Sequence, residues 1–300
     1  MRIQLTFSVQ RYKRGEVMSI TFCIVTFDKT RWLANALTSI RKHCPVEYSV
    51  RVFINGEPDE ELKALLTQTE KITVMTSSRN IGASGGRKLL TRGVTTEYTM
   101  ILDDDMYLTE GAIDSAMEVF HENERIGGVG LPHTNPEGRL MSPGGKNLII
   151  RDGVIRRAPP RLESEKKLIE VEDLDGGAMI MRTKMLKDFE WDDRYGTWLE
   201  DIDKSLQILR DGKWKQAIAP KARLIHDRSW LNQKPEYVRV RLNGLSERRS
   251  YNLFRSKWGL RLDFRMHLNY ELIFPFFTLI GWQWPRIALD HFTRERSYKE

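Results

Sequence analysis

Short apolar runs alternate with amphipathic helical segments through residues 18–131, and this alternation constrains the fold more than any other feature of the sequence. A short continuous apolar run bounded by turn residues is typical of a strand that is buried on both faces. Four strand–helix units in succession predict an α/β fold with a mostly parallel sheet and helices on both of its faces. The predicted strands cover residues 20–25, 50–54, 72–75 and 98–102.

The composition is that of an ordinary globular protein with a basic surface. Forty per cent of the 300 residues are hydrophobic, which suits one large domain or one domain with an appendage. The 48 Lys and Arg residues exceed the 41 Asp and Glu residues, so the formal net charge is +7. This charge favours nucleotides, phosphates, nucleic acid or an acidic lipid surface as partners without choosing among them. Cys23 and Cys44 have no metal-binding or redox spacing, which fits a reducing cytoplasm.

The pattern divides the chain into four predicted parts. Residues 1–17 lack the unbroken apolar segment of a secretory signal and are predicted to form an arm or an added edge strand. Residues 18–131 hold the strand–helix units. Residues 132–230 contain less regular segments that are rich in Gly, Pro and charge, and residues 231–300 are predicted to form a helical C-terminal extension.

Three aspartates, Asp103, Asp104 and Asp105, follow the fourth predicted strand directly. In open α/β sheets, ligands bind just beyond the carboxyl ends of the strands. Clustered carboxylates raise one another's pKa unless a cation compensates, and hard oxygen ligands suit Mg²⁺ or Mn²⁺. The alternative is a solvated acidic turn that caps the helix beginning near Thr109.

Polar residues also end the other three predicted strands. Thr26 and Asp28 follow the first strand, Asn55 follows the second, and Arg79 and Asn80 follow the third. Because these ends point the same way in a parallel sheet, one crevice is expected to hold groups for a base, a phosphate and a metal. Each residue taken alone is more typical of a turn.

A glycine-rich segment, residues 79–87, opens the third predicted helix. It lacks the Gly-Lys-Ser/Thr of a phosphate-binding Walker loop and the spacing of a dinucleotide-binding loop. Two interpretations remain open: backbone N–H groups that hold an anion, or close packing of the helix against the sheet.

The second half carries three further candidates. Asp152-Gly153 predicts a hairpin turn, and Glu200-Asp201 opens a predicted helix, where an ionised carboxylate is favoured by ~0.3–1 kcal/mol. These carboxylates are candidates for a general base or for simple helix caps. His226 ends a short predicted strand and is a candidate metal ligand or a structural histidine.

The order of these motifs resembles that of the GT-A glycosyltransferases of family 2, over roughly residues 18–230. The resemblance implies a GT-A (Rossmann-like) fold, a nucleotide-sugar donor, expected to be a UDP-sugar, a divalent Mn²⁺ or Mg²⁺ and inversion at the anomeric carbon. The acceptor would be a hydroxyl of a glycan, a lipid-linked molecule or another compound, in bacterial surface glycan or glycoconjugate synthesis. The enzyme would be cytoplasmic, or peripheral to the inner face of the membrane.

The resemblance also implies roles for individual residues. Asp201 would be the catalytic base, while Asp103, Asp105 and His226 would hold the metal. The nucleotide pocket would be lined by Thr26, Asp28, Asn55, Arg79, Asn80, Asp103 and Asp104. The acceptor region would contain Gly176, Gly177, Trp198 and Glu200. One departure is Asn55, because many relatives carry Asp at this position.

Two alternative functions are weighed against this one. A sugar-1-phosphate nucleotidyltransferase shares the sheet plan but is expected to carry a glycine-rich basic loop after the first strand, which residues 26–29 do not resemble. A non-catalytic basic module that binds nucleic acid or membrane would leave the ordered carboxylates unexplained. The basic and aromatic C-terminal region is compatible with a helical cap on the sheet domain, with peripheral membrane contact or, less well, with nucleic-acid binding.

Overall fold

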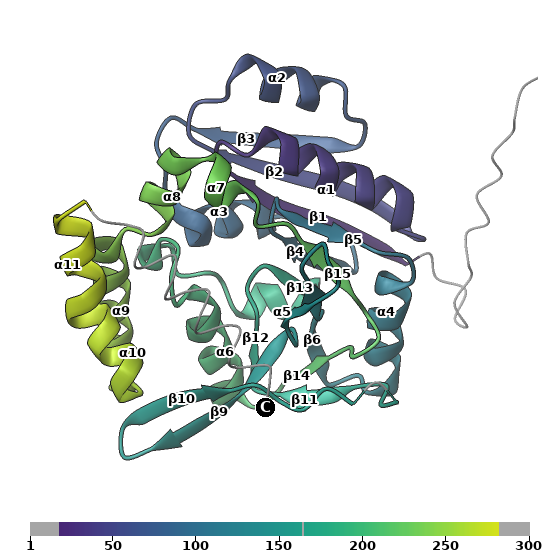
Figure 1. Ribbon diagram of the computed structural model, residues 1–300. Helices are drawn as coiled ribbons and strands as arrows, with labels where there is room; N and C mark the ends of the chain where they lie inside the picture. The colour runs from purple at the N-terminus through teal and green to yellow at the C-terminus, as the bar shows by residue number, and fades with distance from the viewer. Residues whose placement is uncertain (1–17, 164, 282–300) are drawn as a thin grey trace, which may run out of the picture.

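The computed structural model describes residues 18–163 and 165–281. The predicted arm at residues 1–17 and the last part of the predicted C-terminal extension therefore lie outside the described residues. Within the described part, the α/β prediction with a C-terminal helical extension is confirmed (Figure 1).

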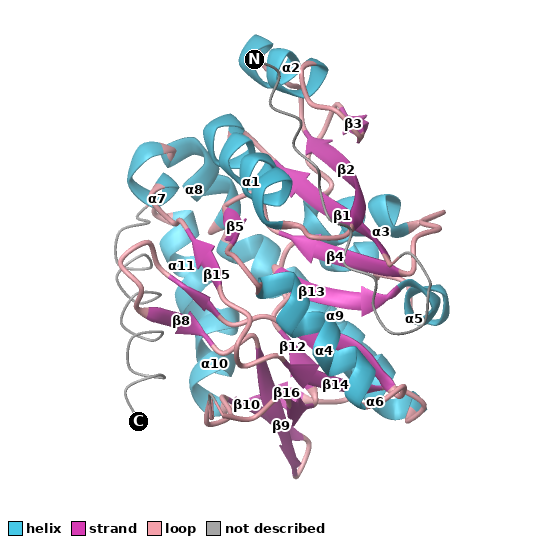
Figure 2. Cartoon of the chain, turned by 90° about the vertical axis from the view of Figure 1, so that its right-hand side faces the viewer, coloured by secondary structure: helices cyan, strands magenta, loops and turns pink. Residues whose placement is uncertain are grey.

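An eight-stranded sheet forms the centre of the molecule, in the strand order β11-β14-β6-β13-β4-β1-β2-β3. Figure 2 shows these strands one above another, from β3 at the top to β14 lower down. The four predicted strands are all present and pair in parallel as β4-β1-β2-β3. Their bounds are Ser19–Thr26 for β1, Glu47–Asn55 for β2, Ile72–Ser77 for β3 and Tyr98–Leu102 for β4.

The other half of the sheet mixes both directions. Strand β13 lies antiparallel between β4 and β6, while β14 runs parallel to β6 and antiparallel to β11 at the edge. The sheet is therefore mostly parallel, as predicted. The bounds are Ile126–Gly130 for β6, Ile169–Val171 for β11, Ala178–Arg182 for β13 and Lys215–Ile218 for β14.

Helices cover both faces because side chains alternate across each buried strand. Phe22 and Ile24 of β1 face a core formed with α1, α2 and α4, whereas Cys23 faces a second core formed with α3, α5 and α6. The bounds are Thr30–His43 for α1, Glu60–Thr67 for α2, Gly82–Thr91 for α3, Ala112–Glu122 for α4, Thr183–Asp188 for α5 and Glu200–Asp211 for α6.

Two small sheets complete the second half. One has the order β5-β15-β7-β8 and pairs His226 of β15 with Met106 of β5, immediately after the three aspartates. The other has the order β12-β9-β10-β16 and contains the predicted hairpin, whose turn residues Asp152 and Gly153 both have positive φ. The bounds are Met106–Leu108 (β5), His133–Thr134 (β7), Leu140–Ser142 (β8), Gly145–Arg151 (β9), Val154–Ala158 (β10), Asp173–Leu174 (β12), Leu224–His226 (β15) and Arg261–Leu262 (β16).

The C-terminal helices pack against α6, beside the central sheet. Figure 1 shows α9, α10 and α11 together at the left edge of the molecule. Tyr251, Phe254 and Tyr270 form a third core with Ile202 and Leu206 of α6, as expected for a helical cap. No helix within residues 18–281 is long and apolar enough to cross a membrane. The bounds are Trp230–Gln233 (α7), Pro235–Arg241 (α8), Gly244–Trp258 (α9), Phe264–Leu268 (α10) and Phe274–Leu279 (α11), with a π-helical turn at Asn269–Ile273.

Candidate active site

A cavity of about 840 Å³ runs from the carboxyl ends of β1, β2 and β4 to the C-terminal helices. Its size is typical of a small-molecule site. The structure brings together most of the residues that the sequence singled out. Those lining the cavity are Thr26, Asn55, Asn80, Asp103, Asp104, Asp105, Gly176, Gly177, Trp198, Glu200, Asp201 and His226.

Asp28 and Arg79 are not among the residues that line this cavity, which differs from the expectation for the nucleotide pocket. Asp28 has a positive φ and directs its carboxylate to Lys234, with Oδ1 and Nζ 3.0 Å apart. The side chain of Arg79 is exposed in the turn after β3. A strand end therefore determines the neighbourhood of a residue but not the direction of its side chain.

Lys29 supplies the cation that the acidic run requires, and sequence reasoning missed it. Its Nζ contacts a carboxylate oxygen of Asp104 and lies 2.9 Å from Oδ2 of Asp105, and all three side chains are buried. The ammonium group also lies 5.2 Å and 4.9 Å from the ring centroids of Trp230 and Tyr237. The sequence clue that could have identified Lys29 is its position three residues after β1, because β1 pairs with β4 and the aspartates directly follow β4. The acidic run is thus a buried charge cluster and not a solvated turn.

The environments of Asp104 and Asp105 differ. Burial raises the pKa of Asp104 to about 7, although Lys29 and a hydrogen bond from Thr26 Oγ1 (2.8 Å) act in the opposite direction. Burial also opposes ionisation of Asp105, but Lys29 and His226 outweigh it and hold the pKa of Asp105 well below its usual range. Asp105 is therefore the constantly charged carboxylate of the pair.

Arg87 of α3 connects the two ends of the cavity. Its Nη2 donates to Oδ1 of Asp103 at 3.0 Å, and its Nη1 donates to Oε1 of Glu200 at 2.9 Å. The glycine-rich helix start brings Arg87 to this position by close packing. A Cβ on Gly82 would lie 2.5 Å from Cα of Gly196, and Ser84 N–H already donates to the Gly196 carbonyl at 2.7 Å. These contacts favour the packing interpretation over anion binding at this helix start.

The candidate base Asp201 lies in the first turn of α6 beside Arg157, whose Nη2 is 3.1 Å from Oδ2. Burial raises the pKa of Asp201, but Arg157 and Lys146 outweigh this effect and lower it below the usual value. Its neighbour Glu200 behaves differently, because burial outweighs Arg87 and raises the pKa of Glu200 to about 7. Asp201 is therefore ionised at neutral pH, as a base must be, while Glu200 titrates near neutrality.

Gly176 and Gly177 lie against the charged groups and leave no room for a side chain. A Cβ on Gly177 would lie 2.4 Å from Oδ2 of Asp103, and one on Gly176 would lie 3.0 Å from Nη1 of Arg87. The two glycines therefore allow the turn between β12 and β13 to approach the acidic run closely.

The three predicted metal ligands are only partly assembled. Oδ1 of Asp105 is buried without a hydrogen-bond partner and lies 3.5 Å from Nε2 of His226, whereas Asp103 is held by Arg87. Within residues 18–281, no three His, Cys, Asp or Glu side chains are close enough to enclose a metal on their own. Mg²⁺ and similar ions are commonly bound by one or two protein groups together with substrate phosphates. The Asp105–His226 pair fits a site of that kind.

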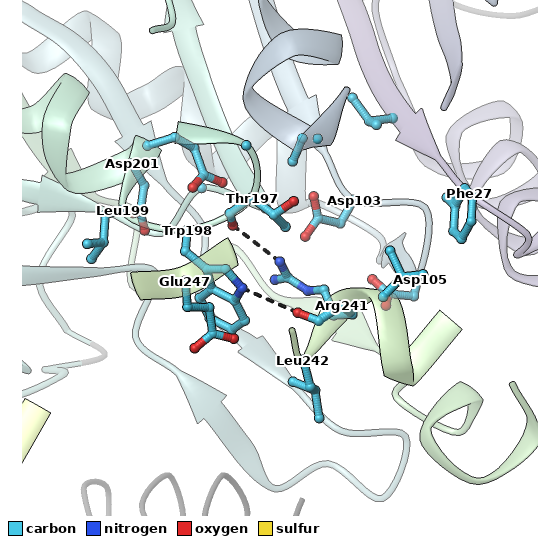
Figure 3. Close-up of a pocket in the computed structure, with 18 of the residues that line it drawn as sticks. Phe27, Asp103, Asp105, Thr197, Trp198, Leu199, Asp201, Arg241, Leu242 and Glu247 are labelled. Atoms are coloured by element: carbon cyan, nitrogen blue, oxygen red, sulfur yellow. Dashed lines mark hydrogen bonds between the residues drawn. The ribbon is translucent and has the colours of Figure 1, made fainter. Parts of the chain in front are cut away.

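The C-terminal region contributes residues that sequence reasoning did not place in the site. Trp230 Nε1 donates to Oδ2 of Asp105 at 2.6 Å. Arg241 of α8 donates from Nη1 to the Thr197 carbonyl at 3.2 Å, and its guanidinium lies 4.4 Å from the Trp198 ring centroid (Figure 3). The only sequence signal was the alternation of basic and aromatic residues, which does not specify where these side chains point.

The fold and the site define a class of protein: an α/β enzyme with acidic groups at the ends of parallel strands and a carboxylate pair facing them. A family model described as "Glycosyl transferase family 2" matches residues 21–189, more than half of the chain. The chain therefore belongs to this family, and the protein is a glycosyltransferase.

Solved structures agree with this fold. GalNAc-T7, crystallised with UDP, GalNAc and Mn²⁺, matches with 15% identity and a TM-score of 0.60 over 89% of this chain, which spans 58% of the GalNAc-T7 chain. TarS 1–349 from S. aureus matches with 12% sequence identity and a TM-score of 0.53. The complex of the same protein with UDP matches with 14% sequence identity and a TM-score of 0.54. Each match covers 84% of this chain and 74% of the TarS chain. These likenesses confirm the GT-A fold. A search of curated proteins finds no match.

Proposed function

We propose that this protein is a metal-dependent inverting glycosyltransferase that moves a sugar from a nucleotide diphosphate, expected to be UDP, to a hydroxyl acceptor. The observation that carries the proposal is the shared cavity. Asp105 and, 3.5 Å from it, His226 line the cavity beyond β4, and Figure 3 shows Asp201 on the opposite side, above Trp198. A donor and an acceptor bound along this cavity would meet between these groups.

The nucleotide would bind at the ends of β1 and β2. Oδ1 of Asn55 accepts the Ile81 N–H at 2.7 Å, so the NH₂ group of Asn55 is the part of its side chain left to meet the base. A uracil carbonyl is a suitable acceptor for this donor. The structures of GalNAc-T7 and TarS that contain UDP support the choice of UDP over other nucleotides.

In the proposed reaction, the acceptor hydroxyl attacks the anomeric carbon from the face opposite the diphosphate. Asp201 takes the hydroxyl proton, and its low pKa keeps it ready to do so across the neutral range. Inversion follows from this single displacement. Alignment of the two substrates in one cavity supplies a further part of the rate enhancement.

A divalent metal would be held by Asp105 and His226 and completed by the donor diphosphate. When bound, such an ion supplies Lewis-acid stabilisation to the departing phosphate. Asp103, held by Arg87 at 3.0 Å, would orient toward the ribose or toward the outer shell of the metal. The Mn²⁺ in the GalNAc-T7 structure supports this assignment.

The acceptor is proposed to be a glycan, a lipid-linked glycoconjugate or another hydroxyl compound, in bacterial surface glycan synthesis at the cytoplasmic face of the membrane. Gly176, Gly177, Trp198 and Glu200 are the proposed acceptor-side residues. This part of the proposal rests on the family resemblance, supported by the position of these residues in the cavity wall.

A donor panel tests the proposed function. Hydrolysis and thermal-shift measurements with UDP-, GDP- and dTDP-sugars, with Mn²⁺ or with EDTA, should show a metal-dependent response to UDP-sugars. Tight oligonucleotide binding without any response to nucleotide-sugars would instead favour the non-catalytic module. Nucleotidyl transfer from a nucleoside triphosphate to a sugar 1-phosphate would favour the nucleotidyltransferase.

A further inference from the structure

The basic side chains that line the cavity differ in how they are neutralised. Lys29 contacts Asp104 and Asp105, and Arg87 contacts Asp103 and Glu200. Lys146 contacts Asp175, and Arg157 contacts Asp173 and Asp201. Each of these cations is therefore committed to a carboxylate of the protein itself.

Arg241 is different. Its hydrogen bond and its ring contact are with neutral groups, the Thr197 carbonyl and the Trp198 ring. Burial opposes its charge, but nearby Tyr237, Glu200 and Asp103 outweigh this effect and raise the pKa of Arg241. Within the described part of the chain, no carboxylate forms a direct ion pair with it. An arginine is charged at all physiological pH values and has five N–H donors, of which one is used here. A guanidinium in a cavity that is not directly paired with a carboxylate has N–H donors left for an anionic group of the substrate.

The position of Arg241 identifies which anionic group that is. Figure 3 shows its side chain between Trp198 on one side and Asp105 on the other, below Asp103, with the guanidinium directed toward Thr197. Asp105 marks the proposed metal and diphosphate end, and Trp198 marks the acceptor end. The guanidinium therefore lies where the bond between the sugar and the diphosphate would be.

Helix α8 is fixed on both sides of the cavity, so this placement is preorganised. Toward the donor side, Lys234 pairs with Asp28 at 3.0 Å and the Tyr237 ring packs 6.0 Å from Phe27, centroid to centroid. Toward the acceptor side, Trp198 Nε1 donates to the Arg241 carbonyl at 3.3 Å.

We propose that Arg241 binds the diphosphate of the donor and stabilises the negative charge that develops on it as the sugar leaves. This inference rests on the proposed function. The acceptor oxygen forms a bond to the anomeric carbon as the bond from that carbon to the diphosphate oxygen breaks. The electron pair passes to the diphosphate oxygen, the acceptor proton passes to Asp201, and the guanidinium stays protonated and donates hydrogen bonds. Arg241 lies outside residues 21–189, the segment that the family model matches.

Calorimetric titration of UDP and uridine into wild type and Arg241→Gln tests the contact. The variant should bind UDP about 10-fold to 150-fold more weakly, because a charge-assisted hydrogen bond contributes about 1.5–3 kcal/mol, and should bind uridine as wild type does. Arg241→Lys should fall between the two, since it keeps the charge but loses the fork of donors. Arg239→Gln is the matched control, because Arg239 is exposed on the same helix outside the cavity wall.

Turnover supplies the second measurement. In Arg241→Gln, kcat with a UDP-sugar should fall about 100-fold or more while the donor KM changes less, as for loss of a preorganised transition-state donor. Equal weakening of UDP and uridine, or an unchanged kcat, would overturn the role of Arg241. If wild type binds no UDP, the proposed donor is wrong and the inference falls with it. If wild type and Arg241→Gln bind UDP equally, only the role of Arg241 is refuted.

Discussion

Replacing Lys29 with Met would leave the Asp104 and Asp105 carboxylates buried without their cation. Both carboxylate side chains are at most 4% exposed, and Lys29 contacts each of them. Removing one partner of a buried ion pair costs about 3–5 kcal/mol, because the remaining charge is uncompensated. We therefore expect Lys29→Met to lower the free energy of unfolding by about 4 kcal/mol at pH 8. Urea denaturation followed by tryptophan fluorescence measures this change.

The pH dependence tests the electrostatic cause. In wild type the pKa of Asp104 is about 7, raised above its unfolded value, so its contribution to stability is lost as the pH rises through 7. Without Lys29 this pKa rises further, so as the pH falls the variant takes up the proton on Asp104 at a higher pH than wild type does. As the pH is lowered, the loss of stability caused by Lys29→Met should therefore shrink. The total decrease is about 1.4 kcal/mol for each unit by which the substitution raises the pKa of Asp104.

A double variant provides the control. Lys29→Met with Asp104→Asn removes one buried charge and should recover about 1–2 kcal/mol of the loss at pH 8. Mn²⁺ should also raise the melting temperature of the single variant more than that of wild type, because a bound cation can replace the missing ammonium. A loss below about 1 kcal/mol at pH 8, or a loss that does not change with pH, would refute the reasoning.

Three further outcomes are expected. Asp201→Asn should retain UDP binding but lose about 10²–10⁴-fold in transfer, as for removal of a general base; unchanged turnover would exclude Asp201 from this role. Asp105→Ala should abolish the difference in UDP affinity between Mn²⁺ and EDTA, measured by calorimetry, and a difference that persisted would place the metal elsewhere. Gly82→Ala should destabilise the protein by about 3 kcal/mol through left-handed strain and a clash with Gly196, whereas Gly93→Ala, which has left-handed strain and no neighbour within 4 Å, should cost about 1 kcal/mol.

Sequence reasoning predicted the features that depend on local periodicity. The four parallel strands, the apolar faces of their helices and the Asp152-Gly153 hairpin all follow from patterns within a few neighbouring residues. The rule that parallel strand ends share an edge predicted one crevice for Thr26, Asn55, Asn80 and the acidic run, and all of these line one cavity. The placement of Glu200 and Asp201 with them was implied only by the family resemblance. Their catalytic roles remain predictions.

What sequence reasoning missed depends on contacts between distant segments. Lys29 and Arg87 neutralise carboxylates 75 to 113 positions away in the chain, and Trp230 and Arg241 enter the site from a helical region without a motif. Asp28 and Arg79 show the converse, since both follow strands but neither lines the cavity. The glycine-rich helix start allowed two interpretations until its neighbour Gly196 was known.

The pairing of β5 with β15 has a consequence for how the site comes into existence. The antiparallel pairing of Met106–Leu108 with Leu224–His226, continued by a hydrogen bond from the Asp227 N–H to the Asp105 carbonyl at 2.9 Å, joins two segments separated by more than a hundred residues. A fragment ending at residue 189 would retain the acidic run but none of Glu200, Asp201, His226, Trp230 and Arg241. If these residues act as proposed, the site forms only when the last third of the described chain has folded back onto the first.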